Sequence, residues 1–182
     1  WSERARPAAL VATEVITAIK APGITNRIYF GTNLGKFYYS NDNGLSAVQM
    51  STNLPAVSIS SITCDPNDQN FVILSQTALG QRNLWRTSAI SPTGSWTNVS
   101  GPTSGDTNLR LPQAPVNQVL MDPDDPRNTW YVASDLGIFM TTTGGAVFTN
   151  LGTSHGLPQI QVNGLAFNPQ TRHLHAGTFG HG

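Results

Sequence analysis

Short apolar segments recur along the chain at a similar spacing. Three of them run into an Asp-Pro or Asn-Pro pair, at residues 65–66, 122–123 and 168–169, and these pairs lie 57 and then 46 residues apart. The segments are rich in Val, Ile, Tyr, Phe and Thr and are bounded by Gly, Pro, Asn or Asp. This pattern predicts β-strands that are separated by tight turns.

Further segments of the same kind complete a repeating unit. The second segments of the unit cover residues 27–35, 129–137 and 173–180, the third cover 36–40, 83–87 and 138–142, and the fourth cover 47–50, 95–99 and 146–150. Four short antiparallel strands that recur about every 50 residues are typical of β-propeller blades. We therefore predict an all-β fold, a β-propeller of four-stranded antiparallel blades with about three complete blades plus partial edge blades.

The repeats predict how the chain is divided. We expect a single partial β-propeller domain over residues 1–182, in which residues 1–14 form the end of a preceding blade and a linker. Complete blades are expected at 15–56, 57–115 and 116–161, the second with loop insertions, and the start of a further blade at 162–182. Both ends interrupt the pattern, so we expect the missing blades to come from a longer parent chain or from a second copy.

Composition excludes some classes of partner. Ten Lys and Arg residues balance ten Asp and Glu residues, and only 11% of the residues are charged. A nucleic-acid binder usually carries a basic stripe, and a membrane span needs about 18 apolar residues in a row. We therefore expect no nucleic-acid partner and no membrane span. The single cysteine, Cys64, alternates with apolar neighbours and is expected to be a buried strand residue.

One short segment resembles a known repeat. Ser40-Asn41-Asp42-Asn43-Gly44, followed by Ser46, resembles the Asp-box, or bacterial neuraminidase repeat (BNR), S-x-D-x-G-x-x-W/F. Residues 141–148 carry a related segment in the third blade, and residues 29–32 and 176–180 resemble the Y-A-G-T phrase of these repeats. The family includes sialidase-like propellers, sortilin-like repeats and xyloglucanase-type glycoside hydrolases.

The resemblance implies a structural role for the box residues. In such a turn the Asp carboxylate accepts backbone N–H groups, the Gly takes a positive φ, and the aromatic residue packs under the hairpin. The residues concerned are Ser40, Asp42, Gly44, Thr141, Gly145 and Phe148. The sequence departs from the pattern where Ala47 replaces the aromatic residue of the first box and Thr143 replaces the Asp of the third blade.

The resemblance also implies a role for the whole chain. Together with the low Lys content it implies an extracellular or cell-envelope protein, and we expect a binding or scaffold module for glycan or protein ligands. The alternative is a segment of a glycoside hydrolase of the xyloglucanase or sialidase type, whose catalytic carboxylates lie largely outside this chain. A third interpretation is a lectin that assembles from two copies.

Two residues are candidates for ligand binding. Trp85 is the tryptophan expected to be exposed, where its indole could stack on a sugar, whereas Trp96 and Trp130 are expected in the core. Asp135 lies between two predicted strands, at a loop end of the kind that often carries function. The other Asp residues of the repeats stand in Asp-Pro turns, where a turn role is expected.

No cofactor or metal site is expected. His173 and His175 would project from the same face of one strand and could bind a metal, but no Cys or carboxylate completes the ligand set in sequence. The arginines at positions 82, 86, 110 and 127 show no spacing that marks a cluster for a substrate carboxylate.

Overall fold

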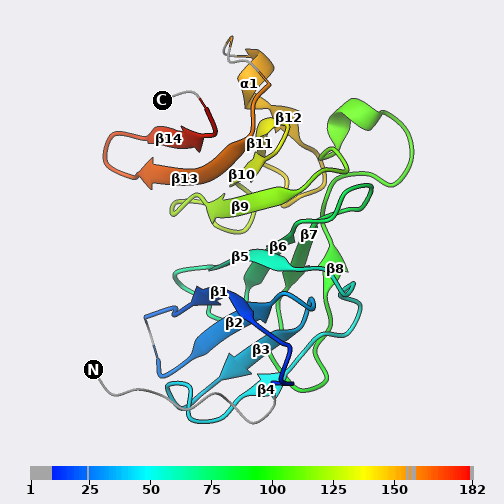
Figure 1. Ribbon diagram of the computed structural model, residues 1–182. Helices are drawn as coiled ribbons and strands as arrows, with labels where there is room; N and C mark the ends of the chain where they lie inside the picture. The colour runs from blue at the N-terminus through cyan, green and yellow to red at the C-terminus, as the bar shows by residue number, and fades with distance from the viewer. Residues whose placement is uncertain (1–9, 24, 155, 157–158, 181–182) are drawn as a thin grey trace.

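The fold consists almost entirely of short antiparallel strands. The computed structural model describes residues 10–23, 25–154, 156 and 159–180 (Figure 1). The first sheet contains β1 (Ile16–Lys20), β2 (Ile28–Thr32), β3 (Phe37–Ser40) and β4 (Val48–Gln49). The second contains β5 (Ile59–Cys64), β6 (Val72–Gln76), β7 (Leu84–Thr87) and β8 (Thr97–Asn98).

The same topology continues along the chain. The third sheet contains β9 (Val116–Met121), β10 (Trp130–Ser134), β11 (Gly137–Thr141) and β12 (Thr149–Asn150), and β13 (Val162–Asn168) pairs with β14 (His173–Thr178). A short 3₁₀ helix (Thr107–Leu109) and α1 (Leu151–Ser154) lie in the connections. Within each four-stranded sheet the strands follow one another in sequence order. This is the predicted blade topology, and we call the sheets blades 1, 2 and 3 and the last pair the terminal hairpin.

The outer strands are shorter than the sequence predicts. The segments 47–50, 95–99 and 146–150 each contribute only two strand residues. These strands stand at sheet edges, where short pairing limits the exposed backbone groups that could pair with another chain. Residues 1–9 of the segment predicted to be the end of a preceding blade and a linker lie outside the described residues.

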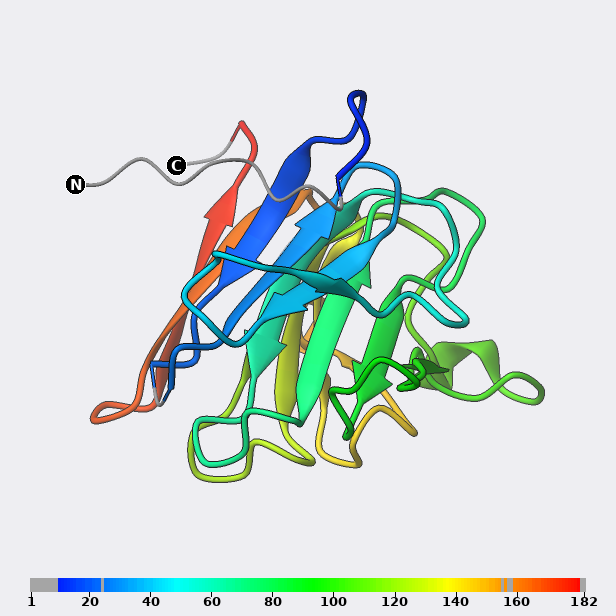
Figure 2. The same ribbon diagram turned by 90° about the horizontal axis from the view of Figure 1, so that it is seen from below.

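The blades pack face to face with their first strands side by side. β1 contacts β5, β5 contacts β9, and β9 contacts β13, so that these four strands form one row of inner strands (Figures 1 and 2). Apolar clusters fill the space between successive blades. Trp96 is buried between blades 1 and 2 and Trp130 between blades 2 and 3, in the core positions expected for both. Cys64 is also buried, in the first of these interfaces.

A β-bulge lies at the same place in each inner strand. The pairing register shifts around the second strand residue, which is Thr17, Ser60, Asn117 or Asn163. A bulge re-aims the side chain of its extra residue. In the first three blades this side chain reaches across to the next blade and donates to the backbone carbonyl of the first residue of the next inner strand. The bonds are Thr17 Oγ1 to Ile59 O (2.6 Å), Ser60 Oγ to Val116 O (2.5 Å) and Asn117 Nδ2 to Val162 O (2.9 Å).

A second set of bonds runs in the opposite direction between the same strands. Ser61 Oγ accepts the N–H of Val119 (3.4 Å), and Gln118 Oε1 accepts the N–H of Leu165 (2.6 Å). In both cases the side-chain oxygen of the third residue of one inner strand accepts a hydrogen bond from the backbone N–H of the fourth residue of the next inner strand. Side chains therefore connect inner strands whose backbones belong to different sheets.

Ion pairs join the blades at the far end of the inner strands. Arg172 of the terminal hairpin binds both carboxylate oxygens of Asp122 in blade 3, and it also contacts Asp124 (2.7 Å). Arg127 of blade 3 bonds to Asp68 of blade 2 in the same way (2.7 Å). The side chain of Asp122 is only 3% exposed, so its charge depends on the arginine.

The turns between the third and fourth strands of blades 1 and 3 have related hydrogen bonds. Ser40 Oγ accepts the N–H of Gly44 (2.8 Å), and Asp42 Oδ1 accepts the N–H of Ser46 (2.9 Å). In blade 3, Thr141 Oγ1 accepts the N–H of Gly145 (3.1 Å). Further along that turn, Thr143 Oγ1 accepts the N–H of Val147 (2.9 Å), and Phe148 is buried beside it.

These turns predict how two glycines respond to substitution. Gly44 and Gly145 have φ values of 86° and 88°, which an L side chain rarely adopts. We expect Gly44→Val to lower the free energy of unfolding by about 1–3 kcal/mol from backbone strain alone. Gly145→Val should cost more, because a Cβ there would lie 2.6 Å from Val99 O. Thermal unfolding tests this, with Gly177→Ala as the control, because its Cβ would make only an ordinary contact with Gly164 O (3.8 Å). Equal midpoints for all three variants and the wild type would contradict the assignment.

The ion pair of Asp122 predicts a pH dependence of stability. Hydrogen bonds from Arg172 lower the pKa of the Asp122 carboxyl below its ordinary value. A carboxyl whose pKa is lower in the folded than in the unfolded state stabilises the fold above its unfolded-state pKa, here about 3.9. This stabilisation is lost as the pH falls through the folded-state pKa. We expect Asp122→Asn to lower the melting temperature at pH 7, and the difference from wild type to shrink below about pH 4. Asp124→Asn is the control, because Asp124 is 77% exposed and should contribute less. A difference that is constant with pH would refute this account.

Candidate functional site

A large cleft lies at the outer edge of blade 2. It has a volume of about 1150 Å³ and is open to solvent. Its walls come from the loop before β5, from β7 and the turn that precedes it, from the connection that follows β8, and from the turn after β11. We call this cleft the outer groove. β7 and β8 form one wall, where they pair at Trp85–Asn98 and Arg86–Thr97.

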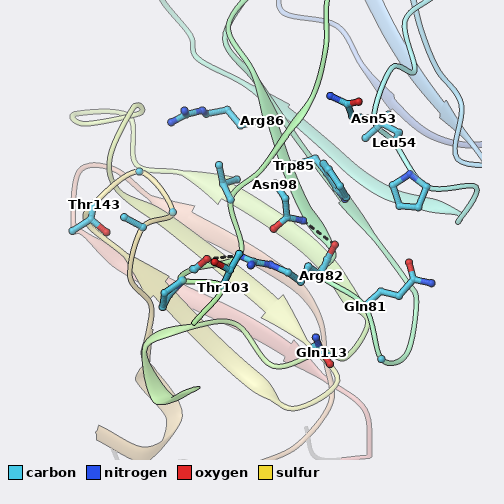
Figure 3. Close-up of a pocket in the computed structure, with 18 residues that line it drawn as sticks. Asn53, Leu54, Gln81, Arg82, Trp85, Arg86, Asn98, Thr103, Gln113 and Thr143 are labelled. Atoms are coloured by element: carbon cyan, nitrogen blue, oxygen red, sulfur yellow. Dashed lines mark hydrogen bonds between the residues drawn. The ribbon is translucent and has the colours of Figure 1, made fainter. Parts of the chain in front are cut away.

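Trp85, a predicted ligand-binding residue, lies in the outer groove. It stands in β7 opposite Asn98 of β8 and packs partly against the apolar cluster between blades 1 and 2. It is half-buried rather than fully exposed, and its Nε1 donor has no hydrogen-bond partner among the described residues. Figure 3 shows the indole on the side of the groove where Asn53 and Leu54 lie.

Arginines supply the charge of the groove. Arg82 donates to the carbonyl of Gly101, while its Nε has no partner among the described residues. Burial and the nearby positive charge of Arg110 lower the pKa of Arg82 below its ordinary value, and the guanidinium remains protonated at neutral pH. Arg86 extends away from Trp85 (Figure 3), and its guanidinium lies 5.8 Å from the centre of the Phe71 ring.

These arginines have no acidic partners in the described chain. In the described chain Lys36, Arg127 and Arg172 form salt bridges, whereas Arg82, Arg86 and Arg110 form none. None of the described residues that line the groove is Asp or Glu. The groove therefore combines an aromatic face, amide side chains and unbalanced positive charge, which suits a ligand with hydroxyl and anionic groups.

Asp135, the second predicted ligand-binding residue, is not in the groove. It lies in the turn between β10 and β11, where its Oδ1 accepts a hydrogen bond from Asn117 Nδ2 (2.9 Å) and its backbone N–H bonds to Pro115 O. Asn117 is the bulge residue that joins blade 3 to the terminal hairpin. The carboxylate therefore orients a side chain that connects two blades, and the structure does not bring it together with Trp85.

Each other carboxylate of the described chain has a local partner. The buried Glu14 accepts from Thr32, Lys36 and Tyr38. Its pKa lies below the ordinary value, because these bonds outweigh the effect of burial, which acts in the opposite direction. Asp42 has a pKa of about 2, owing first to the hydroxyl and N–H of Ser46. Asp residues of the Asp-Pro turns accept backbone N–H groups two residues ahead, as Asp65 and Asp122 do.

The described residues include no group of three or more His, Cys, Asp and Glu side chains that could hold a metal ion. His173 and His175 lie on β14 with ring centres 6.4 Å apart. No helix in the described part of the chain is both long and apolar enough to cross a membrane.

Sequence reasoning missed the arginines of the groove. Arg82, Arg86 and Arg110 lie on different segments, and nothing in their spacing distinguishes them from Arg127, which forms a salt bridge. The available signal was the lack of nearby acidic residues between positions 69 and 105, a stretch that contains two of the three arginines.

Comparisons with known proteins were made by family, by sequence and by structure. No protein-family model matches the chain, and no curated protein matches it in sequence. Solved structures do match: an ancestral GH74 enzyme with a TM-score of 0.68 and 19% identity, and the GH74 xyloglucanase of Xanthomonas campestris with a TM-score of 0.67 and 15% identity. Each match covers 90% of this chain but only 22% and 26% of the respective enzyme.

A structure from another class of protein matches as well. The extracellular domain of a one-component system protein from B. thetaiotaomicron has a TM-score of 0.63 and 18% identity, and the match covers 96% of this chain and 21% of that one. This chain thus spans about a fifth to a quarter of the length of these proteins. At such low identity the likeness shows the fold alone, and it agrees with the predicted blades: the chain is part of a β-propeller.

Proposed function

We propose that this chain is a segment of an extracellular β-propeller that binds an acidic oligosaccharide in the outer groove. The observation that carries the proposal is that a half-buried tryptophan and two arginines without salt-bridge partners in the described chain line the same cleft. Sugars stack on indole faces, and guanidinium groups bind carboxylate or sulfate in bidentate fashion.

The shape of the groove favours an extended ligand. Trp85 and Arg86 point to different sides of the groove (Figure 3), so a single sugar ring would not contact both. An oligosaccharide can lay one ring on the indole and place an acidic group of another ring near the guanidinium. Asn53, Gln81 and Asn98 also line the groove and offer amide groups for hydroxyls.

The extracellular location is part of the same proposal. It is supported by the resemblance to the Asp-box family and by the likeness to the extracellular domain of a one-component system protein. We further propose that the turns around Asp42 and Thr143 are Asp-box turns, since both use side-chain oxygens to accept N–H groups four residues ahead.

Binding can be tested with two matched sugar probes. We expect oligogalacturonides, which carry a carboxylate on each ring, to bind more tightly than neutral galacto-oligosaccharides in isothermal titration calorimetry. Arg86→Gln should weaken binding of the acidic probe by about tenfold and leave the neutral probe unchanged, because only a charge-assisted bond is lost. Lys20→Gln on β1 removes the same charge outside the groove and is the control. Equal affinities for the two probes would count against an acidic ligand.

The aromatic contact has its own test. Trp85→Leu keeps apolar packing against the neighbouring cluster but removes the stacking face, and it should weaken both probes by about five- to tenfold. Thermal unfolding of the variant shows whether its fold is intact. If Trp85→Leu is folded and binds both probes like the wild type, the groove is not the binding site.

The likeness to GH74 enzymes supports an alternative. In that case the chain is a segment of a glycoside hydrolase of the xyloglucanase or sialidase type, with its catalytic carboxylates largely elsewhere. Glycoside hydrolysis generally needs two carboxylates beside the bond that is cleaved. We expect this chain alone to release no reducing ends from xyloglucan. A measurable rate that Asp135→Asn abolishes would favour the enzyme over the binding module.

A further inference from the structure

The turns between the third and fourth strands of blades 1 and 3 are closed by equivalent hydrogen bonds from different side chains. In blade 1, Asp42 Oδ1 accepts the N–H of Ser46 (2.9 Å), and Asp42 Oδ2 accepts the hydroxyl of Ser46 (2.6 Å). In blade 3, Thr143 Oγ1 accepts the N–H of Val147 (2.9 Å), and Val147 has no hydroxyl that a second oxygen could accept. Thr143 thus closes its turn without adding a negative charge.

The turn of blade 3 lines the outer groove, whereas the turn of blade 1 does not. Thr143, Gly144 and Gly145 are among the residues that line the groove. A Cβ atom at Gly144 would lie 3.7 Å from Nη1 of Arg86. Figure 3 shows Thr143 and Arg86 on the same side of the groove. A charge on this turn would therefore act on the guanidinium of Arg86.

The turn of blade 2 beside Arg86 also lacks a carboxylate. Thr87 follows Arg86 at the end of β7, and its Oγ1 accepts the N–H of Ala89 (3.3 Å) inside this turn. Residues 88–95 contain no Asp or Glu. Arg86 therefore adjoins two turns without negative charge, in agreement with its lack of a salt bridge in the described chain.

We propose that Thr143 is a specificity-determining residue of the outer groove, because it leaves Arg86 free to bind an acidic group of the ligand. The inference rests on the proposed function and adds which residue sets the preference for acidic over neutral sugars. Thr143→Asp would keep the bond to the N–H of Val147, as Asp42 bonds to Ser46. Its second carboxylate oxygen would lack the hydroxyl that Ser46 supplies, and its charge would compete with the ligand for the guanidinium.

The test compares two variants that differ in charge but hardly in shape, Thr143→Asp and Thr143→Asn. Each is titrated at low ionic strength with oligogalacturonide, the acidic probe, and with neutral galacto-oligosaccharide in isothermal titration calorimetry. We expect Thr143→Asp to weaken binding of the acidic probe about three- to tenfold, as expected for one added charge close to the guanidinium. Thr143→Asn should bind it like the wild type, and neither variant should change binding of the neutral probe. At about 0.5 M salt the loss should shrink, because ions screen the added charge.

A double variant tests whether Thr143 acts through Arg86. In an Arg86→Gln background the added carboxylate has no guanidinium at position 86 to engage. Thr143→Asp should therefore weaken binding of the acidic probe less in this background than in the wild-type background. An equal loss in both backgrounds would mean that the added charge acts without Arg86, and it would overturn the inference.

Thermal unfolding of Thr143→Asp checks that the turn still closes, and we expect a melting temperature close to that of the wild type. Ala146→Asp is the second variant, with Ala146→Asn as its control. Ala146 is exposed and lines the groove on the same turn, so its substitution adds the charge without changing the side chain that closes the turn. Ala146→Asp should also weaken binding of the acidic probe and leave binding of the neutral probe unchanged.

The outcomes separate this inference from the proposed function. If the wild type prefers the acidic probe and both aspartate variants keep the full preference, the inference is overturned and the proposed function stands. Equal weakening by Thr143→Asp and Thr143→Asn also overturns the inference, because the effect would then come from shape rather than charge. If the wild type binds both probes equally, the proposed function fails and the inference fails with it.

Discussion

The arrangement of the blades depends on the β-bulge at the second residue of each inner strand. Backbone hydrogen bonds between strands hold each sheet together, and those that cross from one blade to the next lie in the outer loops, as from Gly101 N–H to Gly145 O (3.0 Å) and from Trp96 N–H to Thr52 O (3.2 Å). The bulge turns the side chains of Thr17, Ser60 and Asn117 toward the next inner strand, where they bond to its first carbonyl. Hydrophobic contacts between sheets are not directional, whereas these bonds fix which residues of neighbouring strands lie opposite one another.

The candidate site is a consequence of the same arrangement. The outer groove forms where β7 and β8 lie between the loop before β5 and the turn after β11. Trp85 and the arginines around it become accessible there, while Trp96 and Trp130 are enclosed between blades. Asp135 has a different role, because its carboxylate holds Asn117 in the orientation that joins blade 3 to the terminal hairpin. A loop residue singled out for function thus supports the connection between blades.

The repeat pattern allowed most of the fold to be predicted. Each blade uses the same short strands and turn residues, so the errors are confined to the ends of outer strands, where pairing is limited to two residues. The site was predictable only in part. Trp85 could be selected because the other two repeat tryptophans occupy positions typical of the core. Arg82 and Arg86 could not, because they line one cleft only when the turn before β7, β7 and the connection after β8 lie against one another.

The sequence by itself determined the local structure: strand length follows from apolar segments between turn residues, and the positive φ at Gly44 and Gly145 follows from the turn pattern. Only the tertiary structure decided how the blades connect and which charges remain unpaired. Arg127 and Arg172 meet carboxylates of the preceding blade, whereas Arg86 meets none in the described chain. The reason is physical. A strand forms from the properties of its own few residues. An ion pair or a hydrogen bond between blades joins residues about 50 positions apart in sequence, and the packing of the blades sets their distance in space.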